Sequence, residues 1–160
     1  MSALAREVRE EVRVYLVGGT SAVLLGWRAS TMDIDLVMQP ERDAVLRAIP
    51  GIKERLHLNV ELASPGQFIP VPEGWEERSR FICTIGHATF LHYDLYAQAL
   101  AKVERGHARD LADVRAMLDR GVIEAASARD YFQRVESALY RFPAIDPPTF
   151  RRAVDAMFPP

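Results

Sequence analysis

The stretch YLVGGTSAVLLGWRASTMDIDLVM, residues 15–38, constrains the fold more than any other part of the chain. The apolar, β-branched run 12–17 predicts a strand that stops at two adjacent glycines, and residues 20–26 predict a short buried helix. Residues 33–38 predict a second strand. A helix of barely two turns is shorter than the crossover in a standard Rossmann unit, so these residues indicate a small mixed α/β sheet.

The rest of the chain adds two more strand regions and then a series of helices. A first helix capped by Ser2 is expected, with Leu4, Val8 and Val12 on one face. The other expected elements are a helix over 41–49 stopped by Pro50-Gly51, a strand over 56–63, an exposed loop over 64–79, a hairpin of 80–85 and 88–93, and helices over about 94–104, 107–119, 127–141 and 148–157.

Length and composition indicate one domain, residues 1–160, with an α/β core over 1–93 and a helical part over 94–160. The net charge of −2 does not indicate a strongly basic nucleic-acid binder. A single cysteine, Cys83, excludes an internal disulfide and a thiolate zinc site. No apolar run approaches the roughly 18–20 residues of a membrane span, so a cytoplasmic protein without a membrane partner is expected.

Two carboxylates stand inside the predicted strand 33–38. Asp33 and Asp35 are two residues apart, so their side chains point to the same face, with Cα atoms about 6.6 Å apart. Oxygen ligands at that spacing suit Mg²⁺ or Mn²⁺, and a cation removes the cost of burying two like charges. Glu61 becomes a third ligand if its strand lies beside 33–38. The alternative is that these acids line a solvated strand face.

The two glycines precede the short helix. Gly18 and Gly19 let backbone N–H groups approach a phosphate closely, the helix N-terminus adds partial positive charge, and Thr20 offers a hydroxyl donor. A tight strand-to-helix turn without a ligand is the alternative. A phosphate-binding turn followed by a metal-binding strand fits nucleotidyl transfer, in which cations position the nucleophile and the leaving group.

These motifs resemble the signature of the DNA polymerase beta-type nucleotidyltransferase superfamily. The matching residues are VGG (17–19), thirteen residues, and then DIDL (33–36), with Arg28, Ser30 and Thr31 just ahead of the last motif. Within the superfamily the chain is similar to the nucleotidyltransferase toxins of abortive-infection, type IV toxin–antitoxin systems and their small relatives. Those proteins carry a lysine on a later helix and then Arg-Asp and a further Asp, which here are Lys102, Arg109-Asp110 and Asp113.

The resemblance covers roughly residues 13–120 and implies a role for each matching residue. It implies a catalytic set, a metal-binding set and a nucleotide-binding set: catalytic Asp33, Asp35, Glu61 and Lys102; metal-binding Asp33, Asp35 and Glu61; nucleotide-binding Gly18, Gly19, Thr20, Arg28, Ser30, Lys102, Asp110 and Asp113. The third acid is a glutamate here, where an aspartate is commoner in the superfamily.

Several of these residues have an ordinary alternative. Asp110 can cap or begin the helix 107–119, and Arg109 and Asp113, four residues apart, can form a surface ion pair. Lys102 can be a solvated helix lysine, and Arg28 can pair with an acid instead of a phosphate. Trp75, in the proline-rich loop, can stack on a base or close over the core.

The sequence thus predicts a Mg²⁺- or Mn²⁺-dependent nucleotidyltransferase that moves an NMP from an NTP to a hydroxyl of RNA (such as a tRNA end), a protein or a small molecule. A toxin-type enzyme with a cognate antitoxin is one form of this hypothesis. The alternative is a protein that binds a nucleotide or a partner on the same fold without catalysis.

Overall fold

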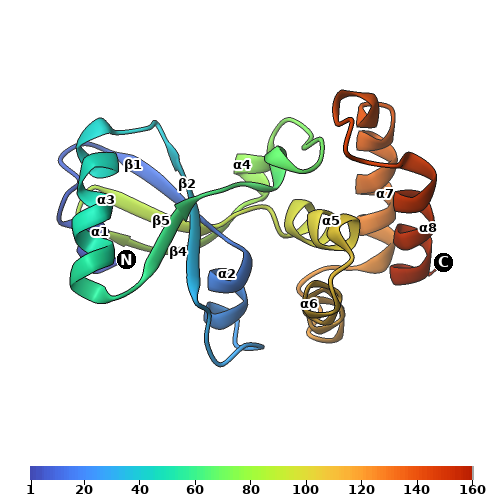
Figure 1. Ribbon diagram of the computed structural model, residues 1–160, viewed down its shortest axis with the longest axis horizontal. Helices are drawn as coiled ribbons and strands as arrows, with labels where there is room; N and C mark the ends of the chain where they lie inside the picture. Colours follow the sequence, from blue (N-terminus) through green and yellow to red (C-terminus); the bar gives the residue numbers. More distant parts are fainter. Residues whose placement is uncertain (160) are drawn as a thin grey trace. The chain divides into compact units, whose positions relative to one another are not determined.

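The computed structural model describes residues 1–159, which form two compact units (Figure 1). The first unit consists of residues 1–64 and 79–93, and the second of residues 65–78 and the described chain from Asp94 onward. The chain passes from the first unit to the second after Tyr93. Residues 65–78 group with the helical unit.

The first unit carries a sheet with helices. Its elements are α1 (Ser2–Ala5), β1 (Val12–Val17), α2 (Gly18–Leu24), β2 (Asp33–Gln39), α3 (Asp43–Leu56), β3 (Asn59–Leu62), β4 (Arg80–Ile85) and β5 (Ala88–His92). The five strands have the order β3-β2-β1-β5-β4. β1 is antiparallel to β2 and parallel to β5, β2 is parallel to β3, and β4 and β5 form the predicted antiparallel hairpin. The mixed sheet confirms the predicted fold class.

Register assigns the two faces of this sheet. Leu16 lies opposite Leu36, and Val14 lies opposite Phe90, and all four belong to the hydrophobic core that also contains Val45 of α3. Because side chains alternate along a strand, the residues between them point to the other face. That other face carries the polar residues of β2 and β3.

The second unit is helical. Its elements are η1 (Pro65–Gln67), α4 (Trp75–Arg78), α5 (Leu95–Arg105), α6 (Ala108–Asp119), α7 (Ala125–Glu136), η2 (Leu139–Arg141) and α8 (Pro147–Met157). Phe132 and Phe150 pack edge to face, with ring centroids 5.0 Å apart, where α7 meets α8. The single helix predicted over 127–141 is instead α7 followed by the 3-10 turn η2.

The prediction that α3 stops at Pro50 is wrong. The helix continues through Pro50 and ends before His57, whose φ of 50° is left-handed. A proline removes one helical hydrogen bond, but Ile49 and Ile52 keep facing the core across it, while Pro50 and Gly51 are exposed. Burial of the apolar face therefore outweighs the lost bond, and the following strand begins later than predicted.

Three other boundaries differ from the prediction. α1 is only four residues long, because Val12 pairs with Ala88 in the sheet instead of extending the helix, although Val8 is buried as expected. α2 begins at the first glycine of the pair and not at Thr20. The segment 64–79 is not simply an exposed loop, because it contains two short helices and the fully buried Ile69.

Candidate functional site

The acids of β2 and β3 lie on one face of two neighbouring parallel strands. Asp35 is in register with Glu61, and Asp33 is in register with Asn59. Residues in register share a face, so Asp33, Asp35 and Glu61 all point away from the core side of the sheet. β3 lies directly beside β2, as the proposed third-ligand role of Glu61 requires.

Asn59 connects two of these acids. Its side-chain nitrogen Nδ2 donates to Oδ1 of Asp33 at 2.8 Å and to Oε1 of Glu61 at 2.7 Å. The amide thereby joins the two carboxylates across the strands. Asn59 is not among the residues predicted from the sequence, because only the register of β2 against β3 shows what lies opposite Asp33.

The donor set of this cluster is entirely oxygen, which suits Mg²⁺ or Mn²⁺. Within the described residues 1–159, however, no group of three or more His, Cys, Asp or Glu side chains is arranged to hold a metal ion. Coordination by all three acids therefore requires their side chains to move closer together. Such a movement is a change of side-chain torsions and leaves the strand register intact.

The two glycines of α2 approach the cluster closely. Gly18 has a φ of +59°, and a Cβ on it would lie 2.9 Å from Oδ2 of Asp35. A Cβ on Gly19 would lie 2.2 Å from Oγ1 of Thr31 and 3.2 Å from Nη1 of Arg28. Only glycine fits at both positions, so the glycine turn, the β2 carboxylate and the Arg28 guanidinium lie next to one another.

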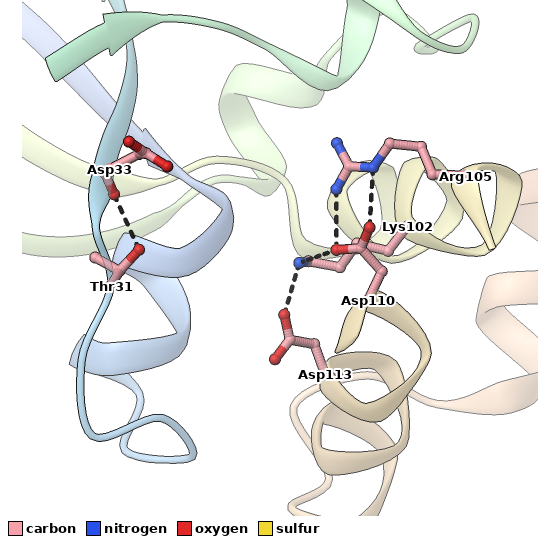
Figure 2. Close-up of polar contacts among 6 residues, drawn as sticks. All are labelled: Thr31, Asp33, Lys102, Arg105, Asp110 and Asp113. Carbon is pink, nitrogen blue, oxygen red and sulfur yellow. Dashed lines mark hydrogen bonds and ion pairs between the residues drawn. The ribbon is translucent and has the colours of Figure 1, made fainter. Parts of the chain in front are cut away.

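Two threonine hydroxyls bind the backbone at the start of β2. Thr31 Oγ1 donates to the backbone oxygen of Asp33 at 3.0 Å (Figure 2), and Thr20 Oγ1 donates to the same oxygen at 3.4 Å. The Thr20 bond holds the first turn of α2 against the start of β2, and the Thr31 bond fixes the backbone just before β2. Ser30, which was also assigned to nucleotide binding, is exposed.

Gly19→Ala is expected to lower the free energy of unfolding by about 1–3 kcal/mol, the usual cost of forcing extra atoms into a packed site. The added methyl group would overlap the Thr31 hydroxyl, so Thr31 and Arg28 would have to shift. Urea unfolding followed by circular dichroism measures the change.

Gly51→Ala is the matched control for Gly19→Ala. A Cβ there meets nothing within 4 Å, and Gly51 lies in the interior of α3. That substitution should stabilise the protein by about 0.5–1 kcal/mol, because alanine is the better helix former. Equal stability changes at the two positions would contradict the close packing of Gly19.

A buried polar pair fastens α2 to β5. Ser21 Oγ donates to the backbone oxygen of Leu16 at 2.9 Å, and His92 Nδ1 lies 3.0 Å from the same Oγ. Because the serine hydrogen goes to the carbonyl, His92 donates from Nδ1. Burial, together with the nearby charge of Arg80, lowers the pKa of His92 to about 4. The link is therefore uncharged at neutral pH.

Lys102, Asp110 and Asp113 form a cluster within the helical unit (Figure 2). Lys102 is only 4% exposed, and its Nζ donates to Oδ1 of Asp110 at 3.1 Å and to Oδ2 of Asp113 at 2.7 Å. Arg105 binds both oxygens of Asp110, with two bonds of 3.0 Å. The alternative of a solvated Lys102 is thus wrong, while its predicted phosphate contact stays a prediction.

The Asp110 carboxyl is charged despite its position. Burial favours its neutral form, but the hydrogen bonds from Arg105 and the charge of Lys102 outweigh burial and hold its pKa below the ordinary value. Asp110 lies in the first turn of α6, whose N-cap is His107. Asp110 therefore does not cap the helix, and its main partners are the two cations of α5.

Asp94, which was not among the residues predicted from the sequence, is a second carboxylate that binds several elements of the helical unit. It is fully buried, caps α5 by accepting from Tyr96 N at 3.0 Å, and binds Nε of Arg78 at 2.7 Å and the hydroxyl of Tyr131 at 3.1 Å. Burial and the Asp94 charge raise the pKa of Tyr131. Arg78 thereby anchors the segment 65–78 to this unit. An Asp before an apolar helical run is the sequence signal of such a cap.

Residues 2–140 match the model of a family described as "Nucleotidyltransferase of unknown function (DUF6036)". The chain belongs to this family. The match includes every residue that the sequence assigned to a site, and it confirms the prediction of a nucleotidyltransferase family. No curated protein and no solved structure matches the chain. The likeness to toxins is a finer statement than the family's description and stays a prediction.

Because the chain belongs to a nucleotidyltransferase family, the acid cluster and the glycine turn can be interpreted together as one candidate site. The family match ends at residue 140, before α8. Among the helices that the structure describes, none is long and apolar enough to cross a membrane.

Proposed function

We propose that this family member transfers a nucleoside monophosphate from an NTP to an acceptor hydroxyl and releases pyrophosphate, with Mg²⁺ or Mn²⁺ as cofactor. The observation that carries the proposal is the placement of three carboxylates, Asp33, Asp35 and Glu61, on one face of β2 and β3 beside the glycine turn. The family's description as a nucleotidyltransferase supports the same reaction class.

The three carboxylates are proposed to hold the cation. Asp35 is central, because its Oδ2 lies nearest to Gly18 and its register partner is Glu61. A bound divalent cation supplies charge neutralisation for the phosphates and activation of the attacking hydroxyl. Asp33 completes the set from the same face of β2.

The glycine turn is proposed to bind the triphosphate. α2 begins at Gly18, and the N-terminus of a helix carries a partial positive charge that favours an anion such as a phosphate. Side chains at Gly18 and Gly19 would block this approach. Arg28, whose guanidinium lies beside Gly19, supplies a positive charge that can bind phosphate.

The acceptor is proposed to be a hydroxyl of RNA, including a tRNA end, of a protein side chain or of a small molecule. A toxin-type enzyme neutralised by a cognate antitoxin in the cytoplasm belongs to the same proposal. The likeness of Lys102, Asp110 and Asp113 to the toxin motif supports it.

The test supplies each of the four NTPs, labelled at the α-phosphate, with Mg²⁺ or Mn²⁺ and either total RNA or a protein extract. The label should pass to one acceptor class from one or two of the NTPs, with release of pyrophosphate, and EDTA should stop the transfer. Binding of an NTP in a thermal-shift assay without any transfer of label would favour the alternative of a non-catalytic nucleotide-binding protein.

A further inference from the structure

Asn59 occupies a particular position in the acid cluster. It is the first residue of β3 and lies in register with Asp33, while Glu61 follows two residues later on the same face. Its Nδ2 therefore stands between a carboxylate of the neighbouring strand and one of its own strand, at 2.8 Å and 2.7 Å.

A primary amide is well suited to this position. Its single nitrogen carries two hydrogens, so it can donate to two acceptors at once, and hydrogen bonds to ionised carboxylates are stronger than those between neutral groups. Each carboxylate uses one oxygen, Oδ1 of Asp33 and Oε1 of Glu61, to accept from the amide. The amide therefore leaves the second oxygen of each carboxylate available to a cation.

We propose that Asn59 is a positioning residue that holds Asp33 and Glu61 as a pair, so that their second oxygens face one shared cation. This inference rests on the proposed function, since the cation is the one that nucleotidyl transfer requires. Without the amide, two like charges on adjacent strands would repel each other and their side chains would spread over several rotamers. A cation would then have to gather them, and its affinity would fall.

The amide also accounts for the arrangement found in the structure. Asp33 and Glu61 are joined through Asn59, and no three acids within residues 1–159 are gathered as a metal site. An orienting partner of this kind acts before the cation arrives. Removing such a hydrogen-bond partner of a metal ligand commonly costs about 10–100-fold in metal affinity.

The first test measures Mn²⁺ binding to the nucleotide-free protein by electron paramagnetic resonance of free Mn²⁺. Asn59→Ala should weaken Mn²⁺ binding by about 10-fold or more relative to wild type. Leu62→Thr is the matched control, since it changes the same strand on its opposite face and should bind within twofold of wild type. Asp35→Asn removes a ligand and should bind more weakly than Asn59→Ala.

The outcomes separate this inference from the proposed function. If the wild type binds Mn²⁺ and Asn59→Ala binds it equally well or more tightly, the role of Asn59 is overturned, while the proposed metal site is retained. Absence of Mn²⁺ binding by the wild type overturns both. An equal loss in Asn59→Ala and Leu62→Thr shows a general effect on β3 and also overturns the specific role.

A second measurement needs no metal. In ¹⁵N NMR spectra of the metal-free wild type, both side-chain hydrogens of Asn59 should exchange slowly with solvent. Asp33→Asn should strongly change the chemical shift of one of these hydrogens, and Glu61→Gln should change that of the other. Side-chain hydrogens of Asn59 that exchange as fast as those of an exposed amide, or that ignore both substitutions, would show that the bridge does not exist in solution.

Discussion

Replacement of Lys102 by alanine is expected to reduce the free energy of unfolding by about 3–5 kcal/mol, the cost of breaking a buried ion pair on one side. The side chain of Lys102 is 5% exposed, and its loss leaves Asp113, with a side chain 4% exposed, without the ammonium that it now contacts at 2.7 Å. Asp110 keeps its two hydrogen bonds from Arg105 in this variant. Urea unfolding at neutral pH measures the change.

The chain's other lysine provides the control for Lys102→Ala. Lys53 lies in the last turn of α3 and is half-buried, so Lys53→Ala should change the free energy of unfolding by less than about 0.5 kcal/mol. Adding Asp113→Leu to Lys102→Met should recover part of the loss, because an apolar pair does not leave a buried charge. A loss below about 1 kcal/mol in Lys102→Ala would contradict the buried pair.

This expectation bears on how Lys102 can be tested in catalysis. A variant that unfolds part of the helical unit loses activity whatever the lysine does to phosphate. Lys102→Arg, which keeps the charge near Asp110 and Asp113, is the better probe of the predicted phosphate contact. If Lys102 were a solvated helix lysine, Lys102→Ala would be expected to keep its folding stability.

Local patterns in the sequence predicted the part of the fold that depends on local chemistry. The strand over 12–17 and the strand beginning at Asp33 were predicted within a residue of their observed bounds, because apolar runs with glycine or proline at their ends are strong signals. Pro50 was overestimated as a stop signal. Burial of Ile49 and Ile52 is a tertiary effect that no single proline reveals.

Asn59 was missed because its role depends on a contact between segments far apart in the chain. Asn59 matters because β3 lies in parallel register beside β2, and nothing near residue 59 announces that register. The buried ion pairs of Lys102 were also not predicted, although the position of Lys102 on its helix offered a partial signal of them. It follows Leu95 and Ala99 at helical spacing, on a face that is otherwise buried, and a charged residue on such a face indicates a partner.

The three acids show the same difference between what the local sequence predicts and what depends on strand pairing. That Asp33 and Asp35 share a face follows from the two-residue period of a strand, and the sequence alone indicated it. That Glu61 joins them required β3 to pair with β2 in one register out of several. A slip of one residue would turn Glu61 toward the core side, where Val60 now lies.

Asp35→Asn is expected to reduce nucleotidyl transfer by about three orders of magnitude or more, because loss of a charged cation ligand removes electrostatic stabilisation of the transferring phosphoryl group. The substitution keeps the shape of the side chain beside Gly18, and it removes a negative charge from a cluster of like charges. The free energy of unfolding should therefore stay equal to that of the wild type or rise. Transfer of α-phosphate label and urea unfolding, measured on the same preparation, test both parts.

Asp43→Asn controls for the removal of any one carboxylate, since Asp43 is exposed in the first turn of α3, and its transfer rate should stay within twofold of wild type.

The same pair of variants, Asp35→Asn and Asp43→Asn, addresses the toxin hypothesis. If expression of the wild type and of Asp43→Asn stops cell growth while Asp35→Asn does not, the acceptor is an essential cellular molecule. Growth arrest by all three would show that the arrest does not depend on transfer. A transfer rate in Asp35→Asn equal to that of the wild type would remove Asp35 from the cation site, because a metal ligand beside the transferring phosphate cannot lose its charge without a kinetic effect.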